Sequence, residues 1–230
     1  MATNYQITLD SQEIMPLLRI EPERPGPLLV IVPSIFGIGP DVIAFANTFA
    51  QAGALVYVLD SFWREHPGAL RIPADTPLAL ERMRRVDPKK VLDDLMSAVA
   101  QGQKEDLCNG FTLLLGICFG GKFVLQGAQG KSIHGVATWH GASLIPVLDA
   151  VVQNQIDVQM DFGESDPLIP MSEVEEIRLR LRPYKDRIQI RSHPGAGHGF
   201  SHIDTMKYRQ DASQAAKKGV LDLIARYRMK

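Results

Sequence analysis

The chain has 230 residues, of which 45% are hydrophobic and 22% are charged, and its formal net charge is −1 at pH 7. This length is enough for one domain with a complete hydrophobic core, and we expect a single domain over residues 1–230. The balanced charge excludes a broad basic surface for nucleic acid, and no apolar run approaches the ~20 residues that span a membrane.

The first third of the chain alternates β-rich runs with longer amphipathic segments. We expect an antiparallel hairpin over residues 5–20. The continuous apolar run at residues 27–33 is typical of a strand buried on both faces. A helix is expected over residues 41–53 and a second buried strand over residues 54–60. Residues 63–85 are rich in proline and charge, which favours a surface excursion over a lid.

The rest of the chain repeats the strand–helix unit without a linker, an internal repeat or a low-complexity segment. The expected strands cover residues 111–116, 133–141, 155–163 and 187–194, and the expected helices cover residues 87–103, 119–128, 172–181 and 205–227. This alternation predicts an α/β fold, in which helices cover both faces of a mostly parallel central sheet.

Basic residues gather between the irregular segment and the helix that follows it. This cluster comprises Arg82, Arg84, Arg85, Lys89 and Lys90. Such a run is more typical of a solvated helix face and turn than of an anion-binding site, so we favour the solvated face.

The two cysteines, Cys108 and Cys118, are too few for a disulfide framework. The first residues lack the charged start and apolar core of a secretory signal, so we expect a cytoplasmic protein with reduced thiols. Cys108 lies in an expected loop and is treated as incidental. Cys118 lies in an expected strand-to-helix turn, where a buried, unreactive cysteine is the alternative to a functional one.

The segment GICFGG, residues 116–121, has the form of a nucleophile elbow in which cysteine replaces serine. Such a sharp turn strains its central residue, and side chains two positions away would collide with neighbouring backbone. Gly116 and Gly120 avoid these collisions, and the N-terminus of the following helix favours the thiolate of Cys118. Because neither the G-x-G-x-x-G fingerprint nor the Walker lysine is present, a phosphate-binding loop is disfavoured.

A nucleophile elbow predicts an acid after a later strand and a histidine after the last strand. Asp166 follows the strand expected at residues 155–163, and His198 lies between glycines just before the C-terminal helix. Each residue alone also fits a turn or an exposed loop. The order Cys118, Asp166, His198 favours a catalytic triad.

Four other residues compete for the roles of acid and base. Asp161 and Glu164 are rival acids, but Asp161 lies within the expected strand and Glu164 comes early in the turn. His193 and His202 are rival bases, but neither has the glycine surroundings that let a loop approach the nucleophile. The acid and the base named above are therefore preferred.

The three preferred residues predict a mechanism. His198 takes the proton of Cys118, and Asp166 holds the orientation of the imidazole. The thiolate attacks an ester or lactone carbonyl and forms a thioester acyl-enzyme, while backbone amides stabilise the tetrahedral oxyanion. We expect these amides to belong to Phe119, next to the nucleophile, and to Ile35, in the turn after the early central strand.

With these motifs placed, the chain resembles the dienelactone hydrolase (carboxymethylenebutenolidase) family of α/β-hydrolases. The resemblance extends from LLVIVPSIFG to the C-terminal helix and rests on the motifs IFG, G-x-C-x-G-G, ESDPLIP and AGH-x-F. It implies an α/β-hydrolase fold and a cysteine hydrolase that acts on small lactones or enol esters and needs no metal or cofactor.

Two positions depart from the best-studied branch of this family. Ser34 stands where that branch has a glutamate beside the catalytic thiol, and His202 stands where it has an arginine that helps to hold a substrate carboxylate. Dienelactone itself is therefore not implied as the substrate, whereas the hydrolytic core is intact. Ser34 fits either a hydrogen bond to the thiol or acyl group, or a plain turn serine.

Further residues are candidates for the walls of a substrate pocket. Trp139 and His140 end the strand after the elbow helix, at the same edge of the sheet, and are interpreted as pocket walls. A hydrogen-bonded structural role is the alternative for His140. Phe36 joins Ser34 and His202 as a candidate, with core packing as its alternative.

The sequence thus predicts hydrolysis of a small ester or lactone, with neither nucleic acid nor membrane as a partner. Two alternatives stay open: a catalytically idle α/β-hydrolase that binds a small molecule, and an acyltransferase that uses the same triad with an acceptor other than water. An idle binder has no physical need of a nucleophile, an acid and a base in order, which argues against it. Both a monomer and a homodimer fit the sequence.

Overall fold

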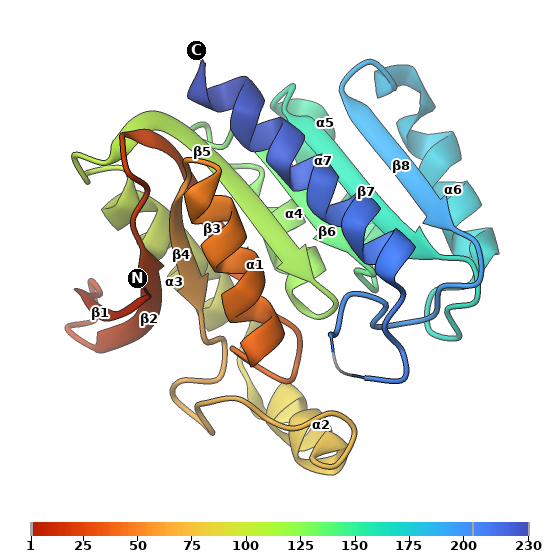
Figure 1. Ribbon diagram of the computed structural model, residues 1–230, viewed down its shortest axis with the longest axis horizontal. Helices are drawn as coiled ribbons and strands as arrows, with labels where there is room; N and C mark the ends of the chain where they lie inside the picture. The colour runs from red at the N-terminus through yellow and green to blue at the C-terminus, as the bar shows by residue number, and fades with distance from the viewer. Residues whose placement is uncertain (1, 204, 230) are drawn as a thin grey trace.

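The computed structural model describes residues 2–203 and 205–229, and it places eight strands in one sheet (Figure 1). The strand order is β1-β2-β4-β3-β5-β6-β7-β8. The hairpin of β1 and β2 is confirmed; β2 also runs antiparallel to β4, and the pairings from β4 to β8 are parallel. The strands are β1 (Thr3–Thr8), β2 (Ile14–Ile20), β3 (Gly26–Val32), β4 (Leu55–Leu59), β5 (Cys108–Ile117), β6 (Gly135–Trp139), β7 (Asp157–Gly163) and β8 (Ile188–His193).

Helices cover both faces of the sheet, which confirms the predicted α/β architecture. One face packs against α1 and α7, and the other packs against α3, α4, α5 and α6 (Figure 1). None of the described helices is long and apolar enough to cross a membrane. The helices are α1 (Pro40–Gln51), α2 (Thr76–Arg85), α3 (Pro88–Gly102), α4 (Gly120–Gly127), α5 (Asp149–Gln153), α6 (Met171–Leu181) and α7 (Gln210–Arg228), with 3₁₀ turns at Ile145–Val147 and Arg182–Tyr184.

The burial of the central strand β3 explains its continuous run of apolar residues. All of its residues are buried, and they alternate between the two cores. Leu28 and Val30 face the helices α3 and α4, whereas Leu29 and Ile31 face α1 and α7. A strand between two helical layers needs apolar side chains on both faces, which produces a continuous apolar run.

The structure corrects three local expectations. The segment 63–85 is not wholly irregular, because its last ten residues form the helix α2. This helix begins three residues after Pro73 and has a proline in its first turn. Cys108 lies in the first position of β5 rather than in a loop. The last helix begins at Gln210 instead of residue 205, because the preceding residues form turns.

Candidate active site

The carboxyl ends of the parallel strands meet at one edge of the sheet, and the predicted site residues lie there. Ser34 follows β3, Cys118 follows β5, His140 follows β6, Asp166 follows β7 and His198 follows β8. Ligands of open parallel sheets bind at this edge, because the loops that leave the strands surround a common space.

The turn that carries Cys118 has the geometry of an elbow. Cys118 adopts a left-handed conformation with φ of 54°, and its amide donates to Trp139 O at 2.9 Å. A Cβ atom at Gly116 would lie 2.6 Å from the backbone of Gly120 and Gly121, and one at Gly120 would overlap the carbonyl of Val32. Both glycines are therefore required by close backbone approach, as their spacing predicts.

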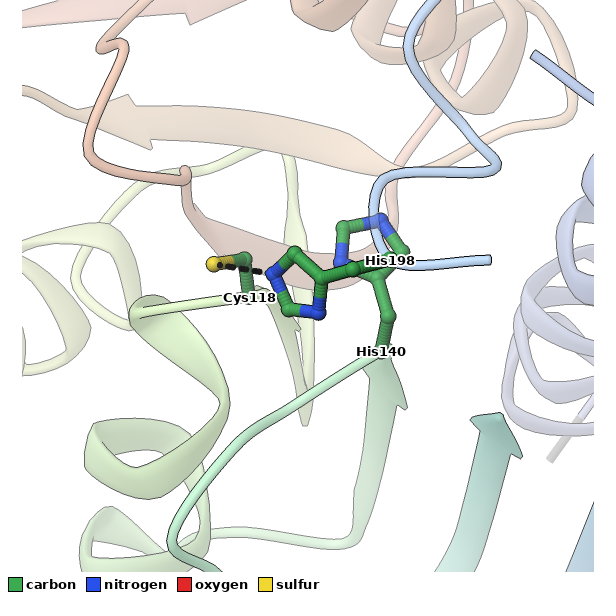
Figure 2. A group of neighbouring side chains, drawn as sticks. All are labelled: Cys118, His140 and His198. Carbon is green, nitrogen blue, oxygen red and sulfur yellow. Dashed lines mark hydrogen bonds between the residues drawn. The ribbon is translucent and has the colours of Figure 1, made fainter. Parts of the chain in front are cut away.

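Three side chains form a continuous series of hydrogen bonds. Cys118 Sγ lies 3.0 Å from His198 Nε2, and His198 Nδ1 lies 2.8 Å from Asp166 Oδ2 (Figure 2 shows the thiol and the ring). The Asp166 side chain is fully buried, and its other oxygen accepts from the amides of Leu168 and Ile169. The acid is thus fixed on its own loop and has one oxygen left for the imidazole.

The rival acids and bases are occupied elsewhere. Asp161 is fully buried and accepts from Arg191, and it lies 2.8 Å from His193 Nε2, so one rival acid and one rival base pair with each other. His202 Nδ1 lies 2.8 Å from Asp41 Oδ2. Glu164 accepts from the hydroxyl of Ser192 at the surface. None of these contacts reaches Cys118.

The electrostatics of this series favour a charged imidazole. Burial lowers the pKa of His198, but the hydrogen bonds to Asp166 and Cys118 outweigh burial and raise the pKa to about 9. An imidazolium beside a sulfur atom stabilises the thiolate, which is the nucleophilic form of cysteine. The charged imidazole therefore lies within hydrogen-bond distance of the Cys118 sulfur.

Cys118 and His198 open into a cavity of about 440 Å³. Five of the residues expected from the sequence line it: Ser34, Ile35, Phe36, Phe119 and His202. The sequence reasoning missed the other lining residues, which are Ile72, Pro73, Thr76, Leu80, Met83, Lys122, Ala142, Ser143, Leu168, Gly199 and Lys207. The segment 63–85 therefore supplies one wall of the cavity. In the sequence, this role is indicated only by the fact that the segment is rich in proline and interrupts the regular strand–helix units.

Two expected pocket walls are wrong. Trp139 is completely buried and packs edge-on against Phe45 of α1, with ring centroids 5.0 Å apart. As the last residue of β6 it points to the face covered by α1 and α7, away from the cavity. His140 is also completely buried, beside the ring of His198, and lies outside the cavity lining (Figure 2).

The turn after β3 is held by several hydrogen bonds. Ser34 O accepts from the amide of Gly37, and Ser34 Oγ accepts from the amide of Phe36 at 3.3 Å, which is the geometry of a turn serine. Among the turn and loop hydrogen bonds of the described residues, the amides of Ile35 and Phe119 are not donors. Both amides belong to residues that line the cavity.

Comparison with known proteins places these features in a family. The family model described as "Dienelactone hydrolase family" matches residues 15–228. A Synechocystis sp. protein assigned as a carboxymethylenebutenolidase is 26% identical over 211 residues, covering 86% of this chain and 85% of its own. "Carboxymethylenebutenolidase 1" of Cupriavidus pinatubonensis is 24% identical over 206 residues, covering 87% and 86%.

Solved structures agree with the fold. The crystal structure of a Klebsiella pneumoniae subsp. pneumoniae protein assigned as a dienelactone hydrolase superimposes with a TM-score of 0.84 at 23% identity, covering 99% of both chains. The predicted α/β-hydrolase fold is therefore confirmed. The match of the family model to nearly the whole chain shows that this protein belongs to the dienelactone hydrolase family and is a carboxylic ester or lactone hydrolase.

Proposed function

We propose that the protein hydrolyses a small lactone or ester through a thioester acyl-enzyme on Cys118. The observation that carries this proposal is the hydrogen-bonded series from Cys118 through His198 to Asp166, with separations of 3.0 and 2.8 Å. The nucleophile and its base lie on the wall of one cavity, and the acid is buried behind them. This is the arrangement that acyl transfer by a cysteine nucleophile needs.

In the first half of the reaction the Cys118 thiolate attacks the carbonyl carbon, and the carbonyl oxygen becomes an oxyanion. The tetrahedral intermediate collapses, the C–O bond of the lactone breaks, and the His198 imidazolium protonates the leaving enolate or alkoxide. A water molecule, deprotonated by the neutral imidazole, then attacks the thioester and releases the acid. Asp166 keeps Nδ1 of the imidazole protonated, so that Nε2 faces the reacting atoms.

The oxyanion is stabilised by the backbone amides of Ile35 and Phe119. Both residues line the cavity beside Cys118, and both amides are free of turn and loop hydrogen bonds among the described residues. Amides that need no reorganisation stabilise developing charge better than water does.

The cavity favours an anionic substrate with an apolar body. Lys122, Lys207 and His202 line it, and its described lining residues include no aspartate or glutamate. Leu80 and Met83 contribute apolar surface from α2. A carboxylate on the substrate would gain from the lysines, in keeping with the carboxymethylene group in the names of the relatives.

The test uses a carboxylate-bearing enol lactone and its neutral methyl ester. We expect turnover of both compounds, a higher kcat/KM for the anion, and a mass increase of one acyl group on the Cys118 peptide after rapid acid quench. Turnover without any acyl adduct on Cys118 would contradict the thioester mechanism. Equal kcat/KM for the two compounds would contradict the anionic substrate.

The pH dependence follows from the raised pKa of His198. Since the imidazolium persists up to about pH 9, it protonates the leaving group below that pH and loses this ability above it. We expect kcat/KM to fall as the pH rises through about 9, measured between pH 5 and 10.5 with ionic strength held constant. A fall near the ordinary histidine pKa of ~6.5 would show that the ion pair does not form.

Arg82 connects this chemistry to the segment 63–85, and it corrects an expectation. The residue was assigned to a solvated basic face, but it is 1% exposed. Its Nε and Nη2 donate to Ile35 O at 2.9 and 2.7 Å, and its Nη1 donates to the carbonyls of His66 and Gly68. Its guanidinium also lies 4.3 Å from the ring centre of Phe62. One cation therefore fixes the turn that contains the proposed oxyanion amide.

We expect Arg82→Gln to reduce kcat by up to about 10²–10³-fold, the cost of losing one oxyanion donor, with a smaller change in KM. Arg82→Lys restores the charge but not the two parallel bonds to Ile35 O, so it rescues only part of the rate. Steady-state kinetics and thermal unfolding, measured together, separate positioning from folding. Arg84→Gln is the matched control, because Arg84 is exposed on the same helix. A variant Arg82→Gln with normal kcat would refute the role.

A further inference from the structure

His140 has an unusual buried environment. Its side chain is completely buried, Nε2 lies 2.8 Å from the hydroxyl of Ser201, and Nδ1 has no hydrogen-bond partner among the described residues. A buried nitrogen without a hydrogen-bond partner is energetically unfavourable. The backbone of His140 is also left-handed, with φ of 39°. The reaction proposed above does not use this nitrogen.

The free nitrogen belongs to a compact group. Cys118, His140 and His198 each offer one ligand atom, and these atoms all lie within 4.8 Å of one another (Figure 2). The outer nitrogens of both rings are held: Nδ1 of His198 by Asp166 and Nε2 of His140 by Ser201. Rings held in this way turn their remaining nitrogens inward, as in metal sites whose histidines are oriented by a second shell.

Metal ions bind cysteine as the thiolate and histidine through an unprotonated ring nitrogen. Nδ1 of His140 has no hydrogen-bond partner among the described residues, which leaves it open to a cation.

We propose that Cys118, His140 and His198 form a binding site for one soft divalent cation, Zn²⁺ above all, which inhibits the enzyme reversibly. One thiolate and two imidazoles are typical zinc ligands. When the cation binds, the proton on Nε2 of His198 passes to solvent and a bond to the metal replaces it. The inhibition rests on the proposed function, because the cation would occupy both the nucleophile and the base.

The dimensions fit with a small adjustment. Tetrahedral zinc bonds of about 2.3 Å to sulfur and 2.0 Å to nitrogen place sulfur and nitrogen about 3.5 Å apart and two nitrogens about 3.3 Å apart. The Cys118 Sγ to His198 Nε2 distance of 3.0 Å must therefore widen, whereas the full spread of 4.8 Å must narrow. Cys118 and His198 line the cavity, so the cation has a route of entry and its fourth position faces that space.

The test separates binding from catalysis. Co²⁺ serves as the spectroscopic probe, because a thiolate ligand gives a charge-transfer band and a tetrahedral site gives intense d–d bands. Zn²⁺ affinity is measured by competition with a chromophoric chelator, and lactone hydrolysis is followed at the same Zn²⁺ concentrations. The proteins are wild type, His140→Asn, Ser201→Ala, Cys118→Ser and the surface control His66→Asn, with circular dichroism as the check of folding. Asparagine tolerates the left-handed backbone at residue 140.

We expect wild type and His66→Asn to bind one equivalent of Zn²⁺, to show both cobalt signatures and to lose activity reversibly. His140→Asn is expected to weaken the affinity by at least about 100-fold, and Ser201→Ala by about 10–100-fold, the usual cost of a lost second-shell contact. Cys118→Ser is expected to lose the charge-transfer band.

Three outcomes would overturn the proposal: Zn²⁺ affinity unchanged in a folded His140→Asn, affinity unchanged in Ser201→Ala, or no cobalt signature in wild type. If wild type binds Co²⁺ as expected but hydrolyses no lactone, the metal site stands and the proposed function fails. If wild type hydrolyses the lactone and Zn²⁺ has no effect on the rate, the inhibitory site fails alone.

Discussion

The Cys118→Ala variant is expected to lose essentially all lactone hydrolysis, by about 10⁶-fold in kcat, the loss that follows removal of a nucleophile from such a catalytic unit. Alanine cannot form the thioester, and the amides of Ile35 and Phe119 then polarise a carbonyl that nothing attacks. The variant should remain folded, because the elbow is shaped by Gly116 and Gly120 and not by the thiol. Steady-state kinetics on the enol lactone and a thermal unfolding curve together check this expectation.

A matched control for this variant is Cys108→Ala. Cys108 lies at the start of β5, where it packs against the edge of the core, and its sulfur donates a long hydrogen bond of 3.9 Å to Phe111 O. We expect the Cys108→Ala variant to retain full activity. Turnover by Cys118→Ala within tenfold of wild type would rule out the thiol as the nucleophile. It would move support to the idle binder if the wild type were equally slow.

The Asp166→Asn variant is expected to reduce kcat/KM by about 10⁴-fold, the known cost of an amide in this position of a triad. The carboxylate accepts from Nδ1 of His198 at 2.8 Å, whereas an amide nitrogen there favours the wrong tautomer. The fold should tolerate the change, because Oδ1 can still accept from Leu168 and Ile169. Without the carboxylate the imidazolium loses its main stabilising contact, so the alkaline fall in rate should also move to lower pH.

Kinetics across pH 5–10.5 test both parts of this prediction, and Glu164→Gln is the control. Glu164 is an exposed acid in the same turn that accepts from Ser192, and its replacement should leave the rate unchanged. A rate for Asp166→Asn close to wild type would exclude Asp166 as the orienting acid. Asp161, the rival buried acid, is already paired with Arg191 and is therefore not in place to substitute for Asp166.

The elbow, the acid and the base could be predicted because each depends on local chemistry at a strand end. Gly116 is required by the backbone of Gly120 and Gly121 in the same turn, and Gly120 is required by the carbonyl of Val32 at the end of the neighbouring strand, so both contacts are visible in the sequence as glycines. The order of Cys118, Asp166 and His198 follows from the order of β5, β7 and β8. The structure brings the three side chains into hydrogen-bond contact, while their roles in catalysis stay predictions.

The errors arose where the environment of a residue depends on distant segments. The sequence predicts that Arg82 is solvated because no acidic partner is evident for it. Its actual partners are backbone carbonyls, which every residue has and which residue types therefore cannot reveal. Trp139 and His140 were assigned to the cavity from their place at a strand end, but the pleat and the packing of α1 bury Trp139 on the other face. The contribution of Lys207 to the cavity depends on how the loop before α7 returns to the site. The cytoplasmic location and the monomeric or dimeric state stay predictions.

The wall that residues 63–85 build has a consequence for how the protein could diversify. The reacting groups follow β5, β7 and β8, whereas Ile72, Thr76, Leu80 and Met83 come from this one excursion. Replacement of these side chains would therefore alter which acyl group fits while the reacting atoms keep their positions. Arg82 limits these replacements, because a changed segment must still place a guanidinium against the carbonyl of Ile35. The excursion is also joined to the turn after β3 by the hydrogen bond from the Leu70 amide to Phe36 O, so the side chains of this wall can change only while both connections persist.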